Sequence, residues 1–160
     1  MSSCSHLHPP EKGLKGYALA TMLAGAEARC EATGERLTSS RRRVLDLLLQ
    51  AGTPMKAYDL MAAFGPEGEP AKPPTVYRAL EFLTRVGLAH RIESLNAFIA
   101  CGLDERPHTA AFLVCDCCGT ALEIEPPASG PVEAAAQAAG YRLNGVTVEA
   151  HGLCSDCADR

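Results

Sequence analysis

The first half of the chain shows apolar residues at helical spacing. Larger apolar side chains recur every three or four positions, and Gly52 stands where the second such run ends. The residues from Thr38 to Ser40 are N-cap candidates for that run, and Pro73 suits the first turn of a later helix. We therefore predict four helices, over about 17–30, 38–52, 57–64 and 73–85.

The helical spacing ends at Gly87. We interpret residues 88–93 and 97–101 as two short strands and 94–96 as the turn between them. This is the pattern of a β-hairpin. Helices followed by a hairpin are typical of a winged helix-turn-helix, in which the last helix enters the major groove of DNA.

A second module follows residue 101. Its pattern predicts two short strands, a helix and a final strand, over 112–115, 122–125, 132–139 and 141–150. A three-stranded sheet with one open face commonly pairs with its copy, so we expect a homodimer through this module. The predicted fold class is α+β, divided into a flexible tail (1–16), a winged-helix DNA-binding domain (17–101), a hinge (102–107) and a small α/β dimerisation domain (108–160).

Length and composition agree with one domain or two small ones. The chain has 160 residues, of which 47% are hydrophobic, an ordinary fraction for a globular protein. No apolar run approaches the roughly 18 residues of a membrane span, and the N-terminal segment lacks the layout of an export signal. We expect a cytoplasmic protein that does not enter a membrane and keeps its cysteines reduced.

The distribution of charge separates the two modules. The net charge is −4 overall, but residues 29–91 hold ten Lys and Arg against seven Asp and Glu. Residues 92–160 hold three against ten. A basic first half and an acidic second half suggest different partners, with nucleic acid for the first, although chance variation of solvated faces is an alternative.

Two Cys-x-x-Cys pairs predict a zinc site in the second module. Cys115 and Cys118 form the first pair, Cys154 and Cys157 form the second, and 35 residues separate them. Each pair lets one tight turn aim two sulfurs at a single point, and four thiolates make the tetrahedral shell of a structural zinc. Two disulfides or two redox-active pairs are the alternatives.

An enzyme is not expected from these motifs. Thiol–disulfide exchange enzymes usually use one cysteine pair at a helix N-terminus in a thioredoxin-like context, which this pattern lacks. A catalytic zinc hydrolase needs an open coordination position and a general base, and no His-Glu-x-x-His motif is present. A thiol-based redox enzyme is therefore the weaker reading of the cysteines.

Four short strings resemble the ferric-uptake-regulator superfamily. They are RLT at 36–38, PPTVYRAL at 73–80, His108 seven residues before the first cysteine pair, and AHGLC at 150–154. The resemblance covers roughly residues 17–157 and is nearest to the zinc-sensing branch, the zinc uptake regulators. The iron-sensing branch usually has a run of histidines where this chain has PHTAA at 107–111.

The resemblance implies a homodimeric repressor that binds a palindromic operator when loaded with zinc and represses zinc-uptake genes. It implies a second, regulatory zinc, and so about two zinc ions per chain. The implied ligands are His90, Cys101, His108 and Glu123, with Glu125 a nearby competitor for the last position. Two ligands lie on the hairpin and two in the second module, so bound metal would favour a closed hinge.

Other members of the superfamily sense iron, manganese, nickel or peroxide, and these are the alternatives to zinc. A ligand set with one sulfur suits zinc, whereas hard metals prefer oxygen and nitrogen.

Candidate contacts to double-stranded operator DNA lie mainly at the start of the fourth predicted helix. Thr75, Tyr77 and Arg78 open this helix, and an arginine there can bond guanine O6 and N7 together. Tyr77 could instead pack in the core. The resemblance adds Tyr58. An arginine run in the second helix suggests phosphate contacts or, alternatively, a solvated helix face: Arg41, Arg42 and Arg43.

Overall fold

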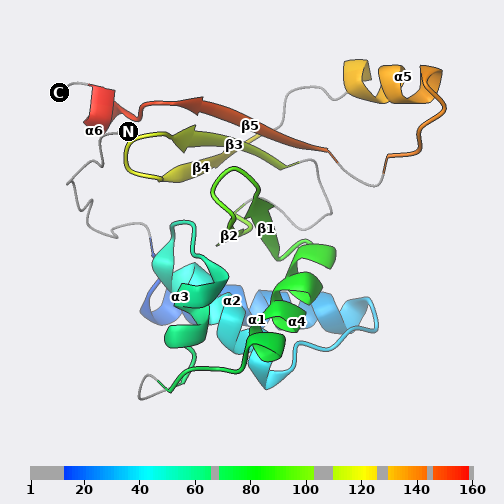
Figure 1. The fold of residues 1–160 in the computed structure, drawn as a ribbon. Helices are drawn as coiled ribbons and strands as arrows, with labels where there is room; N and C mark the ends of the chain where they lie inside the picture. Colours follow the sequence, from blue (N-terminus) through cyan, green and yellow to red (C-terminus); the bar gives the residue numbers. More distant parts are fainter. Residues whose placement is uncertain (1–12, 66–68, 103–109, 126–129, 144–145, 159–160) are drawn as a thin grey trace.

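The computed structural model describes residues 13–65, 69–102, 110–125, 130–143 and 146–158. Figure 1 shows two layers, a helical layer below and a sheet above, with a hairpin between them. Most of the predicted tail, the predicted hinge beyond Gly102, and His108 lie outside the described residues.

Four helices form the lower layer, in agreement with the apolar spacing. They are α1 (Gly16–Ala32), α2 (Ser39–Ala51), α3 (Ala57–Ala62) and α4 (Pro73–Arg85). Leu48 of α2 and Val76 and Leu83 of α4 are fully buried in the common core. Gly52 ends α2 in a left-handed conformation with φ of 60°, which glycine adopts without steric cost.

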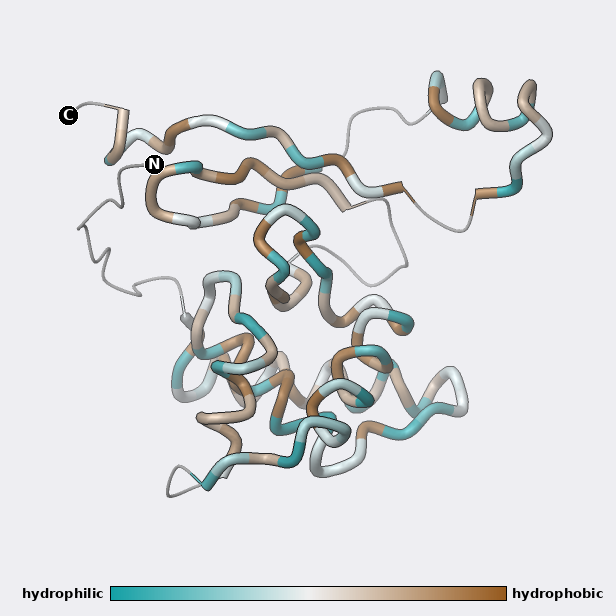
Figure 2. The backbone as a smooth tube through the Cα atoms, viewed as in Figure 1, coloured by the Kyte–Doolittle hydropathy of each residue, from teal (hydrophilic) through white to brown (hydrophobic). Residues whose placement is uncertain are grey.

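The hairpin consists of β1 (Ala89–Ile92) and β2 (Ala97–Ala100), paired antiparallel with His90 opposite Ile99. Asn96 makes the turn with φ of 47°. The sequence pattern did not indicate that Met55 pairs with Phe98, which extends the hairpin toward the helices. Figure 2 shows the hairpin between the helical layer and the sheet, with both apolar and hydrophilic positions along it. This order of helices and hairpin confirms the winged-helix prediction.

The upper layer is a three-stranded sheet with the order β4-β3-β5. β3 (Ala110–Cys115) pairs antiparallel with β4 (Ala121–Ile124) and parallel with β5 (Thr147–Gly152). Helix α5 (Gly130–Ala138) lies beyond one end of the sheet with no buried residue, and the short α6 (Ser155–Ala158) follows β5. The α+β fold class is therefore confirmed.

The predicted start of the last strand is wrong. A strand was expected over 141–150, but β5 begins at Thr147, and 141–143 are not in a strand. Gly140 has φ of 76°, and the Tyr141 N–H donates to the Ala136 carbonyl at 2.8 Å. Tyr141 thus completes the C-terminal turn of α5, and the strand starts only where pairing with β3 becomes available.

The hairpin packs directly on the sheet. A second core contains Ile92 and Ile99 from the hairpin together with Phe112, Val114 and Ala121 from the sheet. Phe112 is fully buried there. Apolar burial between the two layers therefore brings chemically active side chains of the hairpin against those of β4 and β5.

Candidate metal centres and nucleic-acid interface

The two cysteine pairs converge because β3 and β5 are parallel neighbours. Cys115 ends β3 opposite Gly152 of β5, so the turns that follow the two strands lie at the same edge of the sheet. The sulfurs of Cys115, Cys118, Cys154 and Cys157 all lie within 4.8 Å of one another. The predicted four-sulfur group is assembled in the structure.

The spacing of these sulfurs fits zinc. Cys118 Sγ and Cys154 Sγ are 3.8 Å apart, and a tetrahedron with Zn–S bonds of about 2.3 Å has an edge of about 3.8 Å. A disulfide would need a separation of about 2.0 Å, and all four cysteines are free thiols. The geometry thus favours the metal site over the disulfide alternative.

The fold prepares this cluster for negative charge. Burial alone would raise the pKa of Cys115, but backbone N–H groups of Cys118, Cys154 and Cys117 lower it to about 6. The Cys154 N–H donates to Cys115 Sγ at 3.4 Å. Burial and the other three sulfurs raise the pKa of Cys157 to about 12. A thiolate at Cys115 is therefore favoured even without a bound cation. Ionisation of all four cysteines requires the positive charge of a bound dication.

A second group joins the hairpin to the sheet. His90 lies on β1, Cys101 follows β2, and Glu123 lies on β4. Their ligand atoms also lie within 4.8 Å of one another. The His90 and Glu123 side chains are only 12% and 7% exposed, and Cys101 is buried. Glu125 is exposed and is not a member of this group.

The distances within this group also fit zinc. His90 Nε2 and Glu123 Oε1 are 3.2 Å apart, close to the edge of about 3.3 Å expected for N and O ligands at about 2.0–2.1 Å from zinc. Cys101 Sγ is 3.9 Å from the same oxygen. Three predicted ligands thus come together, and the predicted fourth, His108, lies outside the described residues.

Glu123 has a further partner at the start of the predicted hinge. Its Oε2 accepts the Gly102 N–H at 2.8 Å. The His90 ring meets the Phe112 ring edge-on, with centroids 5.8 Å apart. These contacts hold the imidazole and the carboxylate in one orientation.

The predicted base-contacting residues lie at the exposed start of α4. Tyr77 is 54% exposed, so packing in the core, the alternative reading of this residue, is wrong. Arg78 is exposed beside it, and Thr75 is half-buried. Tyr58 is 76% exposed on α3. The surface of α4 and α3 therefore presents two tyrosines and an arginine to solvent.

The three consecutive arginines of α2 have different surroundings. Arg43 donates to the carbonyls of Phe64 at 2.7 Å and Ala63 at 2.9 Å, and it pairs with Asp46 at 2.8 Å. The Arg41 guanidinium lies 3.5 Å above the ring centre of Phe82.

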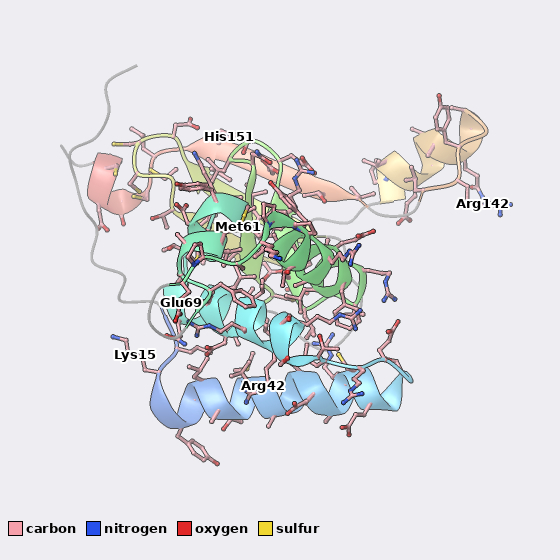
Figure 3. All side chains as sticks on the ribbon, turned by 60° about the horizontal axis from the view of Figure 1, so that its bottom comes forward. Lys15, Arg42, Met61, Glu69, Arg142 and His151 are labelled. Atoms are coloured by element: carbon pink, nitrogen blue, oxygen red, sulfur yellow. The ribbon has the colours of Figure 1, made fainter. Side chains whose placement is uncertain are left out.

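Arg42 is half-exposed and lies 3.8 Å from Glu27 of α1. Figure 3 labels this side chain on α2, close to α1. The run is not a uniform basic stripe, because spacing in sequence does not reveal which arginines have partners.

The Glu149 carboxylate accepts backbone N–H groups of the hairpin turn. No local pattern in the sequence indicates this contact, because the two donors lie about 55 residues away along the chain. Within the described ranges, no helix combines the length and apolar character needed to cross a bilayer.

Comparison with known proteins gives concordant matches. The ferric uptake regulator family model matches residues 32–158. The zinc uptake regulation protein of Escherichia coli K12 is 40% identical over 141 residues, which span 86% of this chain and 82% of that protein.

Two solved structures are similar along nearly their whole length. A zinc uptake regulator complexed with zinc and DNA has a TM-score of 0.82 and 37% identity, covering 91% of this chain and 97% of that one. The holo XcZur structure has a TM-score of 0.78 and 40% identity, covering 88% and 99%.

Proposed function

The chain belongs to the ferric uptake regulator family, and we propose that it is a zinc-responsive transcriptional repressor rather than an enzyme. Its zinc-loaded homodimer binds palindromic operator DNA and represses genes of zinc uptake. It acts where that DNA is, in the cytoplasm. The 40% identity to a zinc uptake regulation protein supports this choice within the family.

The observation that carries the proposal is the buried group of His90, Cys101 and Glu123. An imidazole, a thiol and a carboxylate lose hydration in this position, and a bound zinc supplies the positive charge that compensates them. The group forms only where the hairpin lies on the sheet. Occupancy therefore favours the closed arrangement of the two modules, by the free energy that links the two equilibria.

The composition of this group supports zinc over the other metals sensed in the family. Cys101 contributes a soft sulfur ligand, whereas harder ions such as manganese(II) favour nitrogen and oxygen ligands. We propose His108 as the fourth ligand of this regulatory site. Mixed ligation of this kind binds zinc reversibly, as a sensor requires.

The four-cysteine group is proposed as a closed structural zinc site. Cys115 and Cys118 follow β3, while Cys154 and Cys157 follow β5. These strands have a small shared core, so a metal bond between their ends supplies stability that apolar burial does not. The structural zinc ion is not expected to leave the protein during sensing.

DNA contacts are proposed from the exposed end of α4 and from α3. Tyr77 and Arg78 reach the major groove, and Thr75 lies beside them. Tyr58 contacts the neighbouring phosphate backbone of the DNA. Arg42 contacts a phosphate. For Arg41 and Arg43 we propose a role in stabilising this helix surface rather than in contacting DNA. The Arg41 guanidinium lies on the Phe82 ring, and Arg43 donates to two carbonyls at the end of α3.

The homodimer is proposed to form through the face of the sheet opposite the hairpin. Leu113 and Leu122 are cross-strand neighbours on that face, 45% and 50% exposed. Val132 of α5 is likewise 50% exposed. A second copy covers these residues at little cost, because antiparallel and mixed sheets with one bare apolar face gain from pairing.

The test combines zinc content with operator binding on one preparation. The DNA is a duplex selected from a random pool by the zinc-loaded protein. We expect about two zinc ions per chain, of which mild chelation removes one. DNA affinity is expected to fall as that ion leaves, while circular dichroism shows an intact fold.

Cys101→Ser should reproduce the chelated state at saturating zinc, with one zinc retained per chain. Cys30→Ala serves as the control, because Cys30 is also buried but belongs to neither group. A preparation with one zinc ion, whose DNA affinity ignores chelation, would contradict the proposed function.

A further inference from the structure

One row across the sheet carries two carboxylates that hold the hairpin at different points. Phe112 of β3 lies opposite Glu123 of β4 and opposite Glu149 of β5. Neighbours in such a row point to the same face of a sheet. Glu123 reaches the proposed regulatory site, and Glu149 reaches the hairpin turn.

Glu149 binds the turn through both of its oxygens. Oε1 accepts the Glu93 N–H at 2.7 Å, and Oε2 accepts the Ser94 N–H at 3.2 Å. The Glu149 side chain is only 13% exposed. These bonds join residues 55 and 56 positions apart, and none of the three residues belongs to either metal group.

A short series of polar contacts positions this carboxylate. His151 Nε2 lies 3.8 Å from Glu149 Oε2, and His151 Nδ1 lies 3.0 Å from Asp116, next to the first cysteine pair. Figure 3 labels His151 on β5, where it lies opposite Val114, a member of the core shared with the hairpin. This series of contacts therefore extends from the edge of the structural zinc site to the turn of the hairpin.

The carboxylate is ionised at neutral pH. Burial alone would raise the pKa of Glu149, but the hydrogen bonds from Ser94 and Glu93 and the nearby His151 lower it below its ordinary value. Both bonds to the turn are therefore charge-assisted, which makes them stronger than bonds between neutral groups. The Glu93 side chain points to its own partner, Arg91, at 3.2 Å.

We propose that Glu149 is a metal-independent latch that holds the hairpin on the sheet and thereby sets the zinc affinity of the regulatory site. The second part rests on the proposed function. The His90–Cys101–Glu123 group is complete only in the closed arrangement, so apparent zinc affinity scales with the fraction of molecules that are already closed. The latch raises that fraction before zinc binds.

The first experiment measures amide hydrogen exchange of the wild-type chain before and after mild chelation. We expect the Glu93 and Ser94 amides to stay protected when the regulatory zinc has left, because their acceptor is not a metal ligand. Glu149→Ala should remove this protection. Rapid exchange of both amides in the chelated wild-type chain would overturn the latch.

The second experiment measures regulatory-zinc affinity by competition with a chromophoric chelator. Glu149→Ala is expected to weaken it about tenfold, equivalent to about 1.4 kcal/mol, while the structural zinc stays bound. Glu149→Gln keeps the shape and one acceptor, so it should fall between. Glu125→Ala removes an exposed carboxylate directly after β4, and its zinc affinity should equal that of the wild type.

The outcomes separate the two proposals. Unchanged zinc affinity in Glu149→Ala, with a folded protein by circular dichroism, would overturn the role of the latch in sensing. If the wild-type chain has no removable zinc, the proposed function fails, and amide protection at Glu93 and Ser94 still decides whether the latch exists. If Glu149→Ala does not fold, Glu149→Gln and wild-type exchange carry the test.

Discussion

Arg43→Ala tests whether this arginine supports the helical layer or contacts DNA. The substitution removes three interactions: bonds to the carbonyls of Phe64 and Ala63 and a pair with Asp46. Hydrogen bonds to charged groups contribute about 1.5–3 kcal/mol each when protected from water. The Arg43 side chain is 32% exposed, so water compensates part of this loss.

We expect Arg43→Ala to lower the free energy of unfolding by about 2 kcal/mol in total. For a module of fewer than 100 residues this corresponds to a fall of about 10 °C in the melting temperature. Arg42→Ala is the matched control. Arg42 is half-exposed and its distance to Glu27 is 3.8 Å, so its removal should change the stability by less than about 0.5 kcal/mol.

The assay pairs thermal unfolding with the salt dependence of operator binding. Each phosphate contact contributes about 0.9 to the slope of log affinity against log salt. Arg43→Ala should leave the slope of the folded protein unchanged, and Arg42→Ala should reduce it by about one per subunit. A normal melting temperature with a reduced slope for Arg43→Ala would refute the structural role of Arg43.

Two other substitutions separate the metal and DNA roles. Cys118→Ser should release the structural zinc and unfold the second module, because its two cysteine-bearing turns then lose their common ligand; zinc content and gel filtration would show zinc loss and monomers, and a stable dimer without that zinc would contradict the assignment. Arg78→Ala should weaken binding to the selected operator by about 1–3 kcal/mol and relax the preference at one base pair. Arg78→Lys retains the charge but not the paired bonds, so equal affinities of Arg78→Lys and wild type for every operator variant would show that Arg78 contacts only phosphate.

The sequence was sufficient for features whose causes are local. Apolar spacing, N-cap candidates and Gly52 predicted the helices, and two short segments on either side of the turn at 94–96 predicted the hairpin. The spacing within each cysteine pair determined that its two sulfurs share one ligand point, because three positions fix the geometry of a tight turn. These signals act within a few residues, so they hold whatever the rest of the chain does.

The start of β5 and the surroundings of the arginine run depended on contacts between distant segments. The start of β5 follows from its pairing with β3 and from the turn that ends α5, so alternation over 141–150 placed it too early. Arg41 lies on Phe82 of α4, and Arg43 donates to carbonyls that follow α3; no property of an arginine run reveals these partners.

The regulatory group is the clearest division between sequence and structure. Spacing alone left His90, Cys101 and Glu123 without a reason to meet, and only a resemblance to a family grouped them. The structure brings them together because Ile92, Ile99 and Phe112 bury a shared apolar surface, which fixes the hairpin on the sheet. The same docking places the Glu149 carboxylate against the hairpin turn. The sequence therefore determined which ligand-type residues are present and which elements carry them. The tertiary packing decided which side chains share a site, because that depends on strand register and on burial between segments far apart in the chain.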